Sequence, residues 1–161
     1  MKSLFLSFLV FLFFISSYGN TFQDTIKNNQ ELPTAFDESR DPQKDLVLAM
    51  KIAKKEKKRI LLDVGGEWCI WCKRLDQFLK ENEDLSSILQ KHFVIVKVNY
   101  SKDNKNEKFL SKYPKVAGYP HIFVLDKKGK LLHSQNTAEL EEGKGYSHKA
   151  ILKFLNKWKG K

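Results

Sequence analysis

The sequence predicts an α/β fold in a single domain. Three short apolar runs have the composition of buried strands, and the segments between them carry apolar residues at helical spacing. Such alternation is typical of a sheet with crossover helices. A chain of 161 residues has room for one ordinary domain, and its 42% hydrophobic and 30% charged residues are close to the globular average. Multi-domain and disordered architectures are therefore excluded.

The first 19 residues have the pattern of a signal peptide. Lys2 precedes the apolar stretch Leu4–Ile15, and the small residues Ser17 and Gly19 fit a cleavage site. An uncleaved membrane anchor is the competing interpretation, but the stretch is shorter than the roughly 20 residues that span a bilayer. We therefore expect an exported protein, periplasmic or secreted, that is cleaved near Gly19. Disulfides persist in such a compartment.

Residues 20–40 read as an irregular, polar leader, and residues 41–161 as the domain. Asp41 and Pro42 predict a helix start, with Asp41 as the N-cap and Pro42 at the first helical position. The helix is expected to extend to about Lys57, because its apolar residues share one helix face: Leu46, Ala49, Met50 and Ala53.

The next two elements flank the only two cysteines of the chain. Residues 59–64 predict a buried strand that ends at Gly65 and Gly66, with Asp63 as an acidic exception. A helix is expected from Cys69 onward, because apolar residues then recur at helical spacing: Leu75, Phe78, Leu79, Leu85, Ile88 and Leu89.

A second strand is predicted at residues 92–99, followed by a short helix at residues 103–113. Because a helix connects the first strand to the second, the two strands are expected to be parallel.

The last part of the chain predicts a hairpin and a final helix. Strands at residues 122–125 and 130–133 flank the turn 126–129 and should pair antiparallel. Residues 135–146 are expected to form a polar loop, after which Ser147 can cap the last helix.

Cys69 and Cys72 lie three residues apart at the start of the predicted helix. Unpaired N–H groups and the helix dipole stabilise a thiolate at this position, which makes Cys69 the expected nucleophile. Cys72 lies further into the helix, is shielded, and can resolve a mixed disulfide by attacking Cys69. The spacing therefore favours a redox-active disulfide.

Three other uses of a cysteine pair fit less well. Haem attachment needs a histidine directly after the second cysteine, where the chain has Lys73. A purely structural disulfide would close too small a loop to add much stability. A structural zinc site needs two further ligands, and the histidines are isolated in the sequence: His92, His121, His133 and His148. We therefore expect no metal, and no cofactor besides the cysteine pair.

Residues on both sides of the cysteines resemble the thioredoxin superfamily. Asp63 lies six residues before Cys69, Lys97-Val98-Asn99 ends the following strand, and Gly118-Tyr119-Pro120 precedes an apolar strand. These features lie within about residues 60–132, and the flanking helices extend the pattern over most of the domain.

The resemblance implies a thioredoxin fold, with a mixed sheet of four or five strands flanked by helices. It implies that the Tyr119–Pro120 bond is cis, with Pro120 beside the sulfurs and the Tyr119 backbone pairing with an extended substrate. It also implies that Asp63 moves a proton to or from Cys72, because a buried carboxylate is otherwise costly. A carboxylate satisfied by the backbone or by Lys97 is the alternative.

The cysteines stand in the sequence Trp68-Cys69-Ile70-Trp71-Cys72, which is similar to an exported thioredoxin-like branch. Its dipeptide differs from the Gly-Pro of ordinary thioredoxins, and Tyr119 is bulkier than usual before the proline. The redox direction and the substrate therefore stay open. Trp68 and Trp71 either form the apolar rim of a substrate groove or cover the helix start.

The chain is basic, with 29 basic and 19 acidic residues and a net charge of +10. Basic residues cluster at residues 51–59 and 153–161. Such a surface attracts acidic partners or anionic lipid headgroups, although a solvated surface is the simpler explanation. Nucleic acid is not expected as a partner, because no recognition motif accompanies the lysines.

The sequence thus predicts an exported thiol–disulfide oxidoreductase that reduces or isomerises protein disulfides through a Cys69/Cys72 cycle. Its expected partners are protein disulfides or dithiols and an upstream electron donor or acceptor, and we expect a monomer. Two alternatives stay open: an oxidase that installs disulfides, and a non-catalytic binding or chaperone-like module of the same fold.

Overall fold

The computed structural model describes residues 31–160, which from Leu32 onward form one compact unit. The predicted signal peptide and the first part of the predicted leader lie outside the described residues. Of the helices in the described part of the chain, none has the length and apolar character needed to cross a bilayer.

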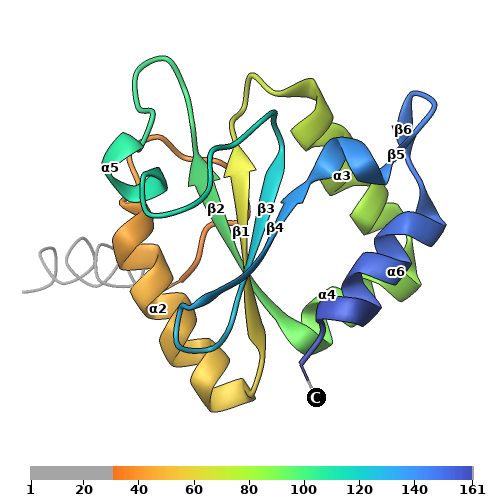
Figure 1. Cartoon of the computed structure of the whole chain (residues 1–161), viewed down its shortest axis with the longest axis horizontal. Helices are drawn as coiled ribbons and strands as arrows, with labels where there is room; N and C mark the ends of the chain where they lie inside the picture. The colour runs from red at the N-terminus through yellow and green to blue at the C-terminus, as the bar shows by residue number, and fades with distance from the viewer. Residues whose placement is uncertain (1–30, 161) are drawn as a thin grey trace, which may run out of the picture. The chain divides into compact units, whose positions relative to one another are not determined.

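A four-stranded mixed sheet lies at the centre of this unit (Figure 1). Its strands are β1 (Arg59–Gly65), β2 (Phe93–Asn99), β3 (His121–Leu125) and β4 (Leu131–Asn136), in the order β2-β1-β3-β4. β2 is parallel to β1, whereas β3 is antiparallel to both β1 and β4. The predicted parallel pair and the predicted hairpin are therefore confirmed.

Helices cover both faces of the sheet. They are α2 (Pro42–Glu56), α3 (Ile70–Glu81), α4 (Glu83–His92), α5 (Glu107–Leu110) and α6 (His148–Trp158). Successive β1 residues point to opposite faces, so Ile60 and Leu62 join the core under α2, while Leu61 joins the core under α3, α4 and α6. Figure 1 shows α2 on one side of the sheet and these three helices on the other.

Side-chain capping bonds are present at the starts of α2 and α3 but not at those of α4, α5 and α6. The Asp41 carboxylate accepts hydrogen bonds from the backbone N–H groups of Gln43 at 2.8 Å and Lys44 at 3.3 Å, which confirms the predicted start of α2. That helix ends at Lys57, which has a left-handed φ of 57°. Ser147 precedes α6 as predicted, but its side chain makes no capping hydrogen bond.

Asn82 divides the long helical pattern after the cysteines into α3 and α4. Its extended backbone interrupts the helix, and its Nδ2 donates to the Phe78 carbonyl at 2.7 Å. The Phe78 carbonyl also accepts the Asn82 backbone N–H at 3.2 Å, so backbone and side chain of Asn82 together close the last turn of α3.

The helix predicted at residues 103–113 is wrong in length, because only α5 is helical there. Asn106, just before it, has a left-handed φ of 48°, and its Nδ2 donates to the Asn99 carbonyl at 2.7 Å. Ser101 Oγ accepts from the Asn104 N–H at 3.1 Å. These side-chain bonds to the backbone compete with helical hydrogen bonds.

The polar loop predicted at residues 135–146 is also wrong, because most of it is regular. β4 continues to Asn136, and a 3₁₀ helix, η1 (Thr137–Leu140), precedes a small hairpin of β5 (Glu141–Glu142) and β6 (Gly145–Tyr146). The segment is too short for a periodic apolar pattern. Three buried side chains hold it to the domain: Thr137, Leu140 and Tyr146.

Candidate active site

The loop between β1 and α3 places both cysteines at the carboxyl end of β1. Cys69 is the N-cap of α3, and the Cys72 N–H donates to Cys69 Sγ at 3.1 Å. The two sulfurs form a disulfide, and only 3% of Cys69 and 2% of Cys72 is exposed. The expectation that the cysteines pair with each other at a helix start is therefore confirmed.

Gly65 and Gly66 allow this loop to approach its neighbours closely. A Cβ atom on Gly65 would lie 2.4 Å from Cys72 Sγ, and one on Gly66 would lie 2.8 Å from the Tyr100 carbonyl oxygen. No side chain fits at either distance, so Gly65 is required for the disulfide to rest on the end of β1 and Gly66 for the loop to approach Tyr100.

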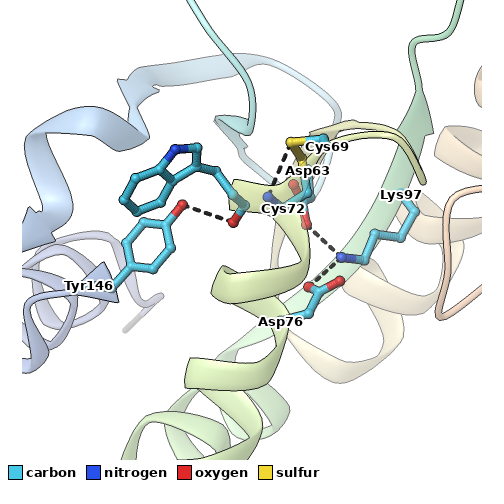
Figure 2. Close-up of polar contacts among 7 residues, drawn as sticks. Asp63, Cys69, Cys72, Asp76, Lys97 and Tyr146 are labelled. Atoms are coloured by element: carbon cyan, nitrogen blue, oxygen red, sulfur yellow. Dashed lines mark hydrogen bonds and ion pairs between the residues drawn. A yellow bond between two sulfur atoms is a disulfide. The ribbon is translucent and has the colours of Figure 1, made fainter. Parts of the chain in front are cut away.

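A polar cluster lies on the inner side of the disulfide (Figure 2). Lys97 Nζ, on β2, donates to Asp63 Oδ2 at 2.7 Å and to Asp76 Oδ1 at 2.5 Å. Asp63 and Lys97 are buried, whereas 44% of the Asp76 side chain is exposed. Asp63 shares a strand face with Gly65, which lies one pleat, about 7 Å, further along β1 and adjoins Cys72.

Lys97 satisfies only one of the two oxygens of Asp63. The second, Oδ1, is buried and has no hydrogen-bond partner among the described residues. Buried carboxylate oxygens are normally bonded, so this one is available to a proton or to a further donor. The alternative, in which Asp63 serves only to pair with Lys97, explains the hydrogen bond of Oδ2 but leaves the burial of Oδ1 unexplained.

Burial and mutual attraction set the ionisation of the cluster. Burial alone would lower the pKa of Lys97, but the carboxylates of Asp63 and Asp76 outweigh it and raise that pKa above its ordinary value. Burial raises the pKa of Asp76, with a further rise from Asp63 and an opposing effect of Lys97. Lys97 therefore stays charged, and Asp76 protonates more readily than a free aspartic acid.

The outer side of the disulfide is aromatic. Trp68 is 59% exposed, its Nε1–H donates to the Tyr100 carbonyl at 2.7 Å, and its ring meets Tyr119 edge-on at 5.6 Å between centroids. Tyr119 stacks on Tyr100 at 4.7 Å, and its bond to Pro120 is cis, as the resemblance implied. Together with Ile70, which is 58% exposed, these rings form an apolar surface beside Cys69.

Trp71 packs on the domain instead. Its ring meets Tyr146 edge-on at 5.8 Å, and the Arg74 guanidinium carbon lies 4.6 Å from its centroid. The Tyr146 hydroxyl donates to the Trp71 carbonyl at 3.2 Å (Figure 2). Burial raises the pKa of Tyr146, so the phenol remains a donor at neutral pH. The two tryptophans therefore have different surroundings.

Phe36 belongs to the site, although the sequence did not predict its contact with the cysteines. It is buried in contact with both cysteines, and Lys97 Nζ lies 4.6 Å from its ring centroid. It comes from the predicted irregular leader, whose Arg40 forms an ion pair with Asp45 of α2. A single aromatic residue in a polar segment has no periodicity that would reveal it.

Two further groups hold the site together. Thr137 donates to the Pro120 carbonyl, as Tyr146 does to that of Trp71, so the segment after β4 supports both the cis-proline and the start of α3. Neither residue could be found from the sequence, because both lie in the predicted loop. Asp76 could have been found, because it follows Cys72 by four residues and shares its helix face.

The histidines do not join the cysteines. Within residues 31–160, no group of three or more His, Cys, Asp or Glu residues lies close enough together to hold a metal ion. His121, directly after Pro120, is buried with Nε2 at 2.8 Å from Ser134 Oγ. Burial, with a smaller effect of His133, lowers the pKa of His121, so its ring is neutral at neutral pH.

Residues 46–141 match the profile of a thioredoxin-like domain. The chain belongs to this family. Among characterised proteins it is similar to the disulfide bond reductase DsbH of Chlamydia pneumoniae, with 27% identity over 93 residues that cover 52% of this chain and 55% of DsbH. It is also similar to the thiol:disulfide interchange protein DsbD of Actinobacillus pleuropneumoniae, with 27% identity over 95 residues, 58% of this chain and 16% of DsbD. The chain thus spans about half of DsbH and a small part of DsbD.

Two solved structures extend the comparison of this thioredoxin-like chain. The disulphide isomerase from Xylella fastidiosa Temecula1 matches with a TM-score of 0.66 and 28% identity, over 79% of this chain and 96% of the isomerase. The C-terminal domain of Neisseria meningitidis DsbD in the oxidised form matches with a TM-score of 0.54 and 17% identity, over 76% of this chain and 98% of that domain. At this identity the match supports the fold alone. The predicted thioredoxin fold and the predicted enzyme class, a thiol–disulfide oxidoreductase, are confirmed.

Proposed function

We propose that this protein is exported and that it reduces or isomerises disulfides in other proteins, with Cys69 as the attacking residue. The observation that carries the proposal is the Cys69–Cys72 disulfide at the start of α3, in contact with the residue before a cis-proline. The named activities of the similar proteins, a disulfide reductase and a disulphide isomerase, support it.

In the proposed reaction, the reduced protein transfers two electrons to a substrate disulfide. The Cys69 thiolate attacks one substrate sulfur, the substrate S–S bond breaks, and the departing thiolate takes up a proton. Cys72 then loses its proton and attacks Cys69, which forms the Cys69–Cys72 disulfide and releases the second substrate sulfur as a thiolate. A dithiol donor must afterwards reduce the protein again.

Asp63 is the proposed proton acceptor for Cys72. It points to the face of β1 on which Cys72 rests, and its buried Oδ1 has no partner among residues 31–160. A carboxylate in this position can take the thiol proton as Cys72 attacks and return it in the next cycle. Lys97 holds the opposite oxygen and fixes the orientation of the group.

The substrate is proposed to bind along the outer side of the disulfide. Trp68 and Ile70 offer exposed apolar area, and Tyr119 presents its backbone beside cis-Pro120 for an extended chain. For Trp71, the contacts with Tyr146 favour a role in covering the start of α3 over a place on the rim of the groove. The substrate class is therefore an extended polypeptide that carries a disulfide.

Export rests on the N-terminal pattern, which lies outside the described residues. A cleaved signal peptide would place the cysteine pair in a periplasmic or extracellular compartment, where protein disulfides persist. The electron donor would then be a membrane-bound or exported dithiol protein. Detection of a mature chain that begins near Asn20 tests this directly; a cytosolic, full-length chain contradicts it.

Reduction of insulin tests the proposed activity. The reduced protein should precipitate the insulin B chain in the presence of dithiothreitol, and Cys69→Ser should lose all activity above the uncatalysed rate. Unchanged turnover by Cys69→Ser would contradict the role of Cys69. A biological effect that survives replacement of both cysteines would instead favour a non-catalytic binding module.

The redox potential separates reductase from oxidase. A value near that of thioredoxin, about −270 mV, supports reduction or isomerisation. A value near about −120 mV would identify an oxidase and would overturn the proposed direction while leaving the cysteine chemistry intact.

A further inference from the structure

The end of the domain opposite the disulfide is strongly basic. Four separate segments meet there, residues 54–59, 91–92, 126–130 and 157–159, and their only acidic residues are Glu56 and Asp126. Their basic residues, which we call the basic end, are Lys54, Lys55, Lys57, Lys58, Arg59, Lys91, Lys127, Lys128, Lys130, Lys157 and Lys159.

The topology brings these segments together. β1 and β2 both begin at this end, where Arg59 pairs with Phe93, and β3 ends there, where Leu125 pairs with Ile60. The end of α6 adjoins the start of β1, since a Cβ atom on Gly160 would lie 3.9 Å from Arg59 Cγ. Figure 1 shows the last turns of α2 and α4 and the C-terminus at this same end.

Neighbouring acids leave most of this charge uncompensated. Glu56 pairs with Lys58 at 2.6 Å, and the Asp126 carboxylate accepts the backbone N–H groups of Lys128 and Lys130 within the β3–β4 turn. His92 has a lowered pKa because it is partly buried and lies near the positive charges of Lys91, Lys159 and Lys58.

Helix stability explains only part of the cluster. Lysines in the last helical turn interact favourably with the helix dipole, which accounts for Lys54 and Lys55 in α2, Lys91 in α4 and Lys157 in α6. It does not account for residues 57–59, which follow α2, or for the three lysines of the β3–β4 turn.

The composition of the basic end favours a lipid surface over a protein partner. Protein interfaces are enriched in arginine and depleted in lysine, and they surround an apolar centre. Here ten of the eleven basic residues are lysines, and the large exposed apolar residues of the described chain, Val47, Trp68 and Ile70, belong to other segments. Phosphate headgroups attract clustered lysines by charge alone.

We propose that the basic end docks on membranes that contain anionic phospholipids and holds the disulfide away from the bilayer. β1 separates Arg59 from Gly65, so the reactive end stands about 20 Å from the docked end and stays open to soluble substrates. The proposal does not depend on the direction of the redox reaction.

Vesicle cosedimentation at low salt tests the proposal with the full chain. Pure phosphatidylcholine vesicles are compared with mixed phosphatidylcholine–phosphatidylglycerol vesicles, so that any contribution of the apolar stretch Leu4–Ile15 is common to both. We expect binding to the anionic vesicles to be stronger and to fall as salt is added. Equal binding to both vesicle types would overturn the proposal.

A pair of matched variants locates the surface. Replacing four lysines of the basic end by glutamine, Lys54, Lys57, Lys128 and Lys157, should weaken binding to anionic vesicles by up to about 1,000-fold. The control replaces four exposed lysines outside the basic end: Lys44, Lys102, Lys108 and Lys115. Equal losses in both variants would mean that net charge, not the basic end, is responsible, and would overturn the proposal.

Two further measurements test the partner and the orientation. Soluble poly-glutamate should not displace the protein from anionic vesicles at equal charge concentration; full displacement would favour an acidic polypeptide and would contradict a lipid partner. Dithiothreitol should reduce the disulfide equally fast with and without bound vesicles. Marked protection by vesicles would show that the reactive end faces the membrane.

Discussion

The two sides of the disulfide have different chemistry. The inner side holds three charged groups, Asp63, Lys97 and Asp76, under the ring of Phe36. The outer side exposes Trp68 and Ile70 beside cis-Pro120, and the ion pair of Glu67 with Lys73 that flanks Trp68 in the sequence is open to solvent. Proton transfer needs the first environment and an extended peptide needs the second, so the difference suggests a division between chemistry on the inner side and binding on the outer side.

Removing the carboxylate of the inner side should have the largest effect after loss of a cysteine. Asp63→Asn should slow insulin reduction by about 100-fold, the lower range for loss of a general base, without changing KM. Asp76→Asn is the matched control, because it also removes a partner of Lys97, and it should slow the rate less than about tenfold. Equal rates for Asp63→Asn and the wild type would remove Asp63 from the proton path.

Variants of the two tryptophans separate a role in substrate binding, proposed for Trp68, from a role in packing, proposed for Trp71. Trp68→Ala should raise KM for a disulfide peptide several-fold and lower the free energy of unfolding by less than about 1 kcal/mol. Trp71→Ala should do the reverse, with little change in KM and a loss of about 2 kcal/mol, because it removes a packed ring under Tyr146. Urea titrations and peptide kinetics on both variants separate the two effects, and a larger KM change for Trp71→Ala would reverse the assignment.

The raised pKa of Asp76 predicts a smaller, pH-dependent effect on stability. Below the pKa of an unfolded aspartic acid, about 3.9, Asp76 is neutral in both states, and the wild type and Asp76→Asn respond alike to pH. As pH rises through the raised folded pKa, the wild type should lose stability relative to the variant, by less than about 1 kcal/mol after solvent screening. Unfolding curves from pH 3 to 7 in which the wild type gains stability over the variant would contradict the raised pKa.

The strands and helix starts that position the cysteines could be predicted from the sequence, because each has a signal in neighbouring residues. The strand before Gly65, the helix start at Cys69 and the cap at Asp41 each depend on neighbouring residues. The cis bond at Pro120 could be predicted only through the resemblance to thioredoxins, because local energetics favour trans.

The contacts that complete the site were not predictable for a physical reason. Phe36 reaches the cysteines, Thr137 the Pro120 carbonyl and Tyr146 the Trp71 carbonyl, all through long-range contacts from segments without helical or strand periodicity. The helix expected at residues 103–113 is shorter than predicted, because asparagine and serine side chains form hydrogen bonds with the backbone there. These bonds compete with helical hydrogen bonds, and the spacing of apolar residues gives no sign of them.

Trapping of the reaction intermediate tests the central claim most directly. Cys72→Ser, reduced and mixed with a disulfide-containing peptide, should accumulate a mixed disulfide that mass spectrometry locates on Cys69. Cys69→Ser should accumulate far less adduct on Cys72, whose sulfur rests against Gly65 at the end of β1. A predominant adduct on Cys72, or no adduct with either variant, would contradict the assignment of Cys69 as the attacking residue and Cys72 as the resolving one.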